Sequence, residues 1–243
     1  MNHDLIYKSY TPILLCGGKG RRLLNKTKTV PKPLLEVAGK PILKHILIEL
    51  KKNGFEECII AVGYLGDLIK DAIGLNYQGI KIIYSDSGKN VGMLKRVYDA
   101  SQLTKKNIYV TYGDTFTKVD WDSINSLDNI KNDYVTILTS KIQNPFGIID
   151  VNEEMIVKKF REKPMLNYYI GHFFCSKNHI DKLNERFVNM KDGTGLVSWF
   201  HDLIASDQLY AHSNDGLQIT FNTYTELKEA DQKLSNYFSI NEF

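Results

Sequence analysis

The sequence predicts an α/β fold of the Rossmann-like kind, in which a mixed, mostly parallel sheet carries helices on both faces. Up to residue 112, apolar runs of strand length alternate with segments of helical periodicity. Glycine-rich or polar stretches follow these strands, as expected where a parallel sheet presents its carboxyl edge. From residue 135 onward short strands dominate. We expect a single domain over residues 1–243 whose architecture changes near residue 140.

The first half has a regular order of strand, loop and helix. Its predicted strands cover residues 13–16, 58–62, 80–84 and 107–111, its helices cover 41–50, 64–73 and 91–103, and residues 1–10 form an extension. Pro41 suits a first helical turn, and Gly54 suits the end of that helix. Since parallel strands present their carboxyl ends at one edge, the loops after residues 16 and 111 are expected to face one site.

The second half is predicted to be rich in strands. These strands cover residues 135–139, 147–151, 155–160, 168–175, 209–212 and 217–221, with a hairpin turn at 152–154 and helices at 178–187 and 196–206. A final helix opens on Thr223-Tyr224-Thr225-Glu226, which has the capping-box pattern, and runs to about residue 234.

Composition excludes several classes of protein. The formal charge of +3 is small and evenly spread, which argues against nucleic-acid binding. The 43% hydrophobic content is ordinary, and no apolar run reaches the roughly 18 residues of a membrane span. The N-terminus lacks the features of a signal peptide, and the three cysteines are best read as buried thiols. We therefore expect a cytoplasmic protein without membrane or nucleic-acid partners.

A glycine-rich loop follows the first predicted strand. Residues 16–22 read Cys16-Gly17-Gly18-Lys19-Gly20-Arg21-Arg22, and Lys32 adds a further cation. Backbone amides of such a loop can point at phosphate oxygens, so the stretch suits a nucleoside triphosphate. Its spacing does not match a P-loop, and the next helix starts too late for a dinucleotide-binding fold. Taken alone, the cluster fits a tight turn with exposed cations about equally well.

Further motifs bring in a resemblance to a known family. The chain resembles the sugar nucleotidyltransferases, most of all the glucose-1-phosphate cytidylyltransferases, over nearly its whole length. The similar motifs are residues 17–23, 31–34, 39–42, 93–97, 112–114, 145–147, 161–164 and 221–223. The resemblance implies a nucleotide-diphospho-sugar transferase fold that transfers a cytidylyl group from CTP to a phosphorylated small molecule, releases pyrophosphate and serves surface polysaccharide (capsule) synthesis.

The resemblance also implies roles for particular residues. Residues 1–140 would bind the nucleotide, through Cys16, Gly17, Gly18, Lys19, Gly20, Arg21, Gly92, Tyr112 and Gly113. Residues 141–243 would bind the acceptor, through Phe146, Gly147, Glu162, Lys163, Gly171 and His172. Arg22, Lys32 and Lys163 would be catalytic, and Asp114 and Asn222 would hold Mg2+. Each residue alone also has a structural reading: Asp114 as a turn residue, Glu162 and Lys163 as a solvated pair, and His172 as a packed ring.

The chain departs from the family at two places that matter. Ile170-Gly171-His172 stands where relatives carry Asn-Gly-Gly, and Asn222 stands where they carry aspartate. Because these changes fall on the acceptor side and at the metal while the triphosphate loop is intact, we expect a retained nucleotide donor and an unusual acceptor, with L-glutamine phosphate favoured, as in a CTP:phosphoglutamine cytidylyltransferase. A glucose-1-phosphate cytidylyltransferase, a phosphocholine cytidylyltransferase and a non-catalytic nucleotide-binding relative remain alternatives, and assembly into a homo-oligomer remains open.

Overall fold

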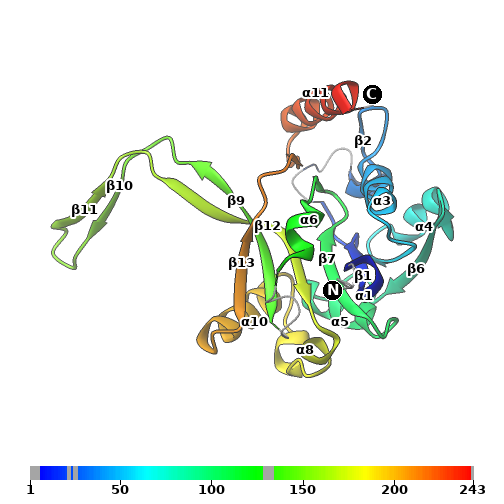
Figure 1. Ribbon diagram of the computed structural model, residues 1–243, viewed down its shortest axis with the longest axis horizontal. Coiled ribbons are helices and arrows are strands. Elements are labelled where there is room, and N and C mark those ends of the chain that lie inside the picture. Colours follow the sequence, from blue (N-terminus) through cyan, green and yellow to red (C-terminus); the bar gives the residue numbers. More distant parts are fainter. Residues whose placement is uncertain (1–5, 21–22, 24–26, 128–133, 242–243) are drawn as a thin grey trace.

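The computed structural model describes residues 6–20, 23, 27–127 and 134–241 of the chain (Figure 1). Its first half contains α1 (Ile6–Ser9), β1 (Tyr10–Leu15), η2 (Lys32–Leu34), β2 (Glu36–Val37), β3 (Lys40–Pro41), α3 (Ile42–Lys52), β4 (Glu57–Val62), α4 (Gly66–Ile73), β5 (Asn76–Tyr77), β6 (Ile80–Asp86), α5 (Met93–Ser101), β7 (Asn107–Tyr112), β8 (Phe116–Thr117) and α6 (Trp121–Asn125). Its second half contains β9 (Val135–Gln143), β10 (Ile148–Val151), β11 (Val157–Arg161), β12 (Met165–Cys175), α8 (Lys177–Asp181), α9 (Glu185–Val188), α10 (Thr194–Ala205), β13 (Leu209–Ser213), β14 (Gln218–Ile219) and α11 (Tyr224–Asn241).

An eight-stranded sheet forms the centre, in the order β13-β9-β12-β7-β1-β4-β6-β5. The pairs β7–β1, β1–β4, β4–β6 and β13–β9 are parallel, whereas β12 runs antiparallel to both of its neighbours and β5 runs antiparallel to β6. The prediction of a mixed, mostly parallel sheet is therefore confirmed. Strands β12, β9 and β13 come from the second half, so both halves of the chain contribute to one sheet.

Helices cover both faces of the sheet because the central strands are apolar on both sides. In β1, Ile13 packs with the core that contains α5, α8, α9 and α10, and Leu14 packs with the core that contains α3, α4, α6 and α11. Ile59 and Ile60 of β4 divide between the two cores in the same way. This alternation places side chains in two hydrophobic layers and leaves the strand ends free to form a site.

Most of the predicted elements of the first half are observed within a few residues of their expected bounds. Strand β1 begins at Tyr10, earlier than predicted. The predicted helix at 178–187 is wrong as a single element, because α8 ends at Asp181 and α9 starts at Glu185. The Asn184 side chain accepts a hydrogen bond from Arg186 N, so it caps a new helix at that point. The last helix continues to Asn241, beyond its predicted end.

A hairpin, β10–β11, extends from the end of the β9–β12 ribbon. The ribbon pairs Met165 with Gln143, and Asn144 N donates a hydrogen bond to the Pro164 carbonyl at 3.0 Å. Beyond that point, among the strands that the structure describes, β10 and β11 pair only with each other. Figure 1 shows this hairpin projecting away from the sheet and its helices, on the side opposite α4. We call residues 144–164 the arm.

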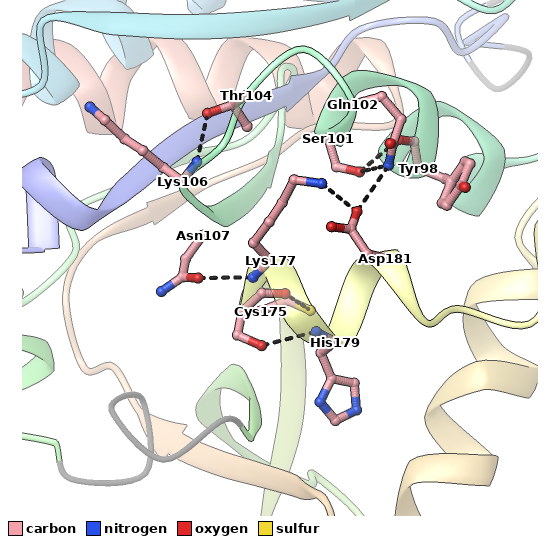
Figure 2. Close-up of polar contacts among 11 residues, drawn as sticks. Tyr98, Ser101, Gln102, Thr104, Lys106, Asn107, Cys175, Lys177, His179 and Asp181 are labelled. Atoms are coloured by element: carbon pink, nitrogen blue, oxygen red, sulfur yellow. Dashed lines mark hydrogen bonds and ion pairs between the residues drawn. The ribbon is translucent and has the colours of Figure 1, made fainter.

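Polar contacts fix β7 to α8 at the amino end of β7, the end opposite the expected site (Figure 2). Lys177 N donates to Asn107 Oδ1 at 2.8 Å, and the Lys177 ammonium pairs with Asp181. Gln102, just after α5, donates to Asp181 Oδ1 at 3.3 Å. The hydrogen bond from Lys177 lowers the pKa of Asp181. These contacts hold the antiparallel strand β12 beside β7 and so help to set its register.

None of the helices in the described part of the chain combines the length and apolar character that a membrane crossing requires. Cys16, Cys58 and Cys175 are buried thiols outside any disulfide, as the sequence predicts.

Candidate active site

A pocket of about 980 Å³ opens at the carboxyl ends of β1 and β7. This is the edge at which the fold class predicts a ligand. The first half contributes most of its wall. The lining residues are Leu15, Cys16, Gly17, Gly18, Lys19, Gly20, Leu23, Lys32, Pro33, Lys89, Asn90, Val91, Met93, Arg96, Tyr112, Asp114, Thr115, Lys191, Asp192, Gly193, Thr220 and Asn222. The structure therefore brings together much of the predicted nucleotide-binding set with both predicted metal ligands.

The start of the glycine loop is anchored to the neighbouring strand β4. Cys16 N donates to the Ala61 carbonyl at 2.9 Å, and Tyr64 N donates to the Gly17 carbonyl at 3.3 Å. Gly18 and Lys19 beyond this anchor are exposed, and Lys19 Nζ donates to Asn90 Oδ1 at 3.2 Å across the pocket. Backbone amides after Gly17 are thus available to a ligand on a loop whose root is fixed.

The Cys16 thiol contributes to the wall of the pocket and is poorly suited to act as a nucleophile. It is 1% exposed, and burial raises the pKa of the Cys16 thiol well above its ordinary value. The thiol faces Gly113, because a β-carbon on that glycine would lie 2.1 Å from Cys16 Sγ. The Cys16 thiol is therefore protonated and enclosed, and it packs in the wall of the pocket. A reactive cysteine would have to be a thiolate.

Arg96 lies beneath the glycine loop and was not among the predicted site residues. Its guanidinium donates to the Val62 carbonyl at 2.7 Å and occupies the space where β-carbons on Gly17 and Gly63 would lie, at 2.5 and 2.4 Å from Nη1. Burial lowers the pKa of Arg96, but arginine remains charged in proteins. A fixed cation therefore supports the loop from below, and glycine is required where the guanidinium approaches the backbone.

A detectable signal for Arg96 exists in the sequence. It lies on α5 among the apolar positions Leu94, Val97 and Ala100, all of which are buried. A charged residue on the buried side of an amphipathic helix has to find a partner, so such a position is a candidate for a functional or supporting role.

Lys32, Asp114 and Asn222 meet at one end of the pocket. Lys32 Nζ lies 2.8 Å from Asp114 Oδ2 and 3.5 Å from Asn222 Oδ1, and it also lies over the Phe221 ring at 5.1 Å from the centroid. The Lys32 side chain is 10% exposed and that of Asp114 is 28% exposed. These three residues are up to 190 positions apart in the chain, and the sheet brings them together.

Local structure positions each member of this cluster. Lys32 opens the short helix η2, directly after Pro31, whose ring restricts the backbone. Asp114 follows the buried strand β7. Asn222 precedes α11, where Glu226 accepts a hydrogen bond from Asn222 N at 2.5 Å and Thr223 Oγ1 accepts one from Glu226 N at 3.2 Å. These two hydrogen bonds are similar to those of the predicted capping box, and they hold Asn222 at the site.

Gly171 lies beside the pocket and supports the Tyr112 side chain. Its φ of +85° favours glycine, and a β-carbon there would lie 2.4 Å from the Tyr112 ring. The Tyr112 hydroxyl contacts Met93 Sδ at 3.4 Å, and burial raises the pKa of Tyr112. Tyr112 and Met93 both line the pocket, so Gly171 affects its shape through the ring.

The His172 ring lies in the core, which corrects the expectation that this side chain contacts an acceptor. The ring is 2% exposed, its Nδ1 lies 2.6 Å from Tyr109 Oη, and its Nε2 lies 2.8 Å from Thr117 Oγ1. Burial lowers the pKa of His172 to about 3, so the ring is neutral at physiological pH. Ile170 is 3% exposed and belongs to the same core. The physical reason is that this end of β12 is covered on both faces, and Ile170 and His172, two residues apart, point to the same covered face.

The arm carries the remaining predicted acceptor residues, and the structure does not bring them to this pocket. Phe146, Gly147, Glu162 and Lys163 all lie outside the residues that line it. The Phe160 ring lies over Gly147, where a β-carbon would be 2.9 Å from Phe160 Cζ. Glu162 and Lys163 are more than half exposed, and their charged groups lie 3.9 Å apart.

Four other predicted positions have simpler outcomes. Gly92 and Gly113 do not line the pocket themselves, although their neighbours Val91, Met93, Tyr112 and Asp114 do. Gly92 lies against the backbone of residues 190–192. Arg21 and Arg22 fall outside the described residues, so their predicted roles stay predictions.

Several polar residues at the rim were missed in the sequence. Lys89 and Asn90 come from the loop before α5, and Lys191 and Asp192 come from the loop before α10. The Asp192 carbonyl accepts a hydrogen bond from Met93 N at 2.7 Å, which ties this second-half loop to the start of α5. No local pattern distinguishes these residues from other surface loops, because only the contact between two distant helices places them at the pocket.

The donor set at Asp114 and Asn222 fits a magnesium ion that also binds phosphates. Among the residues that the structure describes, no three His, Cys, Asp or Glu side chains group together as a metal cage would need. Magnesium, however, commonly uses one or two protein oxygens together with phosphate oxygens and water. The two side-chain oxygens near Lys32 Nζ are of this kind.

A doubly wound sheet with a basic, glycine-lined pocket at the carboxyl ends of its central strands defines a nucleotide-binding α/β protein. The chain belongs to the nucleotidyl transferase family, which it matches over residues 11–233.

Named relatives and solved structures agree with that family. The chain is 36% identical over 155 residues to a D-glycero-alpha-D-manno-heptose 1-phosphate guanylyltransferase of Campylobacter jejuni, an alignment that covers 62% of this chain and 67% of that protein. It is 27% identical over 245 residues to a Bacillus subtilis protein named "Probable glucose-1-phosphate cytidylyltransferase", covering 90% and 94%. The fold is similar to that of HddC from Yersinia pseudotuberculosis, with a TM-score of 0.68, 21% identity and coverage of 93% and 99%.

Proposed function

We propose that this protein transfers a nucleotidyl group from a nucleoside triphosphate to a phosphorylated small molecule and releases pyrophosphate. The observation that carries the proposal is the cluster of Lys32, Asp114 and Asn222 in one pocket with the glycine loop. A loop of free amides suits a polyphosphate, and a cation beside two oxygen ligands suits a reaction in which negative charge moves between phosphates. Membership of the nucleotidyl transferase family supports the same reaction class.

In the proposed reaction an oxygen of the acceptor phosphate attacks the α-phosphorus, and pyrophosphate leaves from the opposite side. Little covalent chemistry falls to the protein, so positioning and charge neutralisation dominate. The amides of residues 17–20 hold the leaving phosphates, with Arg96 beneath them. Lys32 exchanges its contact with Asp114 for phosphate oxygens and neutralises the charge that develops there. Asp114 and Asn222 would hold Mg2+, which would neutralise phosphate charge and hold the triphosphate in place.

The donor we propose is CTP. Similarity of residues 93–97 and 112–114 to the glucose-1-phosphate cytidylyltransferases supports this choice, as does the Bacillus subtilis relative that aligns over 90% of the chain. GTP is the competing donor, because the relative with 36% identity is named a guanylyltransferase.

For the acceptor, we propose a sugar 1-phosphate of surface polysaccharide synthesis. Two named relatives act on a glucose or heptose 1-phosphate. The two residues that favoured an amino-acid acceptor in the sequence, Ile170 and His172, are both buried away from the pocket. L-Glutamine phosphate stays as the second candidate, because relatives carry an asparagine and a second glycine where this chain has Ile170 and His172.

A donor–acceptor matrix tests the proposal. Purified protein with Mg2+ is incubated with CTP, GTP, UTP or dTTP and with glucose 1-phosphate, heptose 1-phosphate, L-glutamine phosphate or phosphocholine, and pyrophosphate release is measured. We expect release with CTP and a sugar 1-phosphate. Turnover only with L-glutamine phosphate would overturn the acceptor, and turnover only with GTP would overturn the donor. Binding of a triphosphate without release in any combination would instead favour a non-catalytic nucleotide-binding protein.

A further inference from the structure

The arm has one apolar face and one charged face. Residues directly opposite in an antiparallel pair point to the same side, and β10 and β11 pair Ile149 with Phe160 and Val151 with Val157. Ile149, Val151 and Phe160 therefore share one face, and Val157 pairs with Val151 beyond a shift in register after Asp150. The four side chains are 41% to 63% exposed. The opposite face carries Asp150, Lys159 and Arg161, with Arg161 and Asp150 in an ion pair at 3.6 Å, and the half-buried Ile148, which pairs with Arg161.

Such a pattern is typical of a sheet that has a core on one side and water on the other. Within the part of the chain that the structure describes, nothing covers this face as a core would, because all four apolar residues are exposed and the two strands pair only with each other. A two-stranded hairpin is marginally stable by itself, and contiguous exposed apolar residues mark an interaction surface. Met155, in the turn between the two strands, is also apolar and 75% exposed.

The arm also holds Glu162 and Lys163, which the family resemblance assigns to the acceptor and which do not line the pocket. Met165 lies six residues before Gly171 along β12, which corresponds to about 20 Å at the usual rise of a strand. Gly171 touches Tyr112 in the pocket wall, whereas Glu162 and Lys163 lie beyond Met165. Figure 1 shows the arm projecting outward from the sheet and its helices.

A second exposed apolar surface begins next to the pocket. Val197 and Ile204 lie on α10, seven residues or two helical turns apart, so they share one side of the helix. They are 55% and 56% exposed. The residues just before this helix, Lys191 to Gly193, line the pocket. In Figure 1 the arm and α10 are far apart, so neither covers the other within one chain.

We propose that the arm docks on a second copy of this chain, with its apolar face on α10, and brings Glu162 and Lys163 to the acceptor side of that copy's pocket. One contact then covers both exposed apolar surfaces and supplies each pocket with the missing acceptor residues. Exchange of arms between two copies forms a closed two-fold dimer, the commonest symmetry of soluble oligomers. The inference rests on the proposed function for the role of Glu162 and Lys163, and on the exposed faces for the contact itself.

Complementation between two inactive variants tests whether the site is shared. Lys32→Ala disables a pocket, and Lys163→Ala disables an arm. In an arm-exchanged dimer of one chain of each kind, the intact pocket receives the intact arm, so an equal mixture that exchanges freely regains about a quarter of the wild-type rate. If each arm serves its own pocket, every site in the mixture lacks one lysine, and a mixture as inactive as the two variants alone overturns the proposal.

Two further measurements do not need turnover. Sedimentation of the wild-type chain is expected to give twice the chain mass of 27.9 kDa, Phe160→Asp is expected to give a monomer, and Lys159→Ser on the charged face serves as the matched control. A wild-type monomer at assay concentration overturns the contact. Cross-linking tests where the arm docks. Because the three native cysteines are buried, a short bismaleimide is expected to react with cysteines introduced on the surface.

A mixture of Glu162→Cys and Lys191→Cys chains is expected to give a covalent dimer, whereas either variant alone gives none. Cross-linking only within a chain that carries both changes would show closure of the arm on its own pocket and overturn the proposal. If no donor and acceptor pair releases pyrophosphate, the proposed function fails, while sedimentation and cross-linking still decide the arm contact.

Discussion

Replacing Lys32 with methionine removes the ammonium that lies between Asp114 and Asn222 and keeps most of the side-chain volume. In the protein without substrate, the Lys32 side chain is largely buried where it pairs with Asp114. The substitution therefore removes a hydrogen bond between charged groups, but it also removes the cost of burying the lysine cation. We expect a net destabilisation of about 1–2 kcal/mol, which for a chain of this size lowers Tm by about 2–8 °C. In the transition state no such compensation exists, and removal of one positioned charge costs about 100- to 1,000-fold in kcat, or about 2.7–4 kcal/mol.

The assay is pyrophosphate release at saturating donor and acceptor, with Tm measured on the same samples. Lys52→Met, at the exposed end of α3, removes the same charge far from the pocket and is expected to leave kcat unchanged. A Lys32→Met protein that keeps its fold and works within about fivefold of the wild type would refute the assignment of Lys32 to charge neutralisation.

Three other changes have defined outcomes. Asn222→Asp adds a charged oxygen beside Asp114, so we expect the Mg2+ concentration for half-maximal rate to fall about tenfold; an unchanged metal titration would show that this position does not face the ion. His172→Gln is expected to make the free energy of unfolding fall less steeply as the pH is lowered. The pKa of His172 is about 3 in the folded protein and near 6.5 in the unfolded chain, so the unfolded chain binds more protons between these pH values. Stability present above pH 6.5 is therefore lost as pH falls, by about 2 kcal/mol at pH 5 relative to the variant, and parallel pH profiles of urea unfolding would contradict this. Arg96→Met is expected to lower the free energy of unfolding by about 2–3 kcal/mol and to raise the KM for the triphosphate, and an unchanged KM would leave Arg96 with a purely structural role.

The fold could be predicted from the sequence because its central strands are short, apolar and buried on both sides. Ile13, Leu14, Ile59 and Ile60 are all fully buried, so each had to be apolar whichever face it serves. Helix bounds in the second half were harder to predict, since the break between α8 and α9 depends on one capping side chain, Asn184.

The site could be predicted in part. The cluster of Lys32, Asp114 and Asn222 was named in advance from motif resemblance, and the structure places all three together. The His172 environment could not be foreseen, because its partners Tyr109 and Thr117 lie more than 50 positions away and become neighbours only through strand register. The position of the arm could not be predicted from the sequence either, because it depends on how far the β9–β12 ribbon extends.

Strand β12 lies between β9 and β7, and this position restricts how the molecule can move. Two lobes joined by a flexible connection can close like a jaw around a substrate, but here β12 hydrogen-bonds to both neighbours across the line where the halves meet. A hinge along that line would have to break the sheet itself. In the proposed reaction, substrate entry and product release would therefore use smaller parts, namely the glycine loop, the loops before α5 and α10, and the arm. Mutations that stiffen these segments are expected to slow turnover without changing the stability of the sheet.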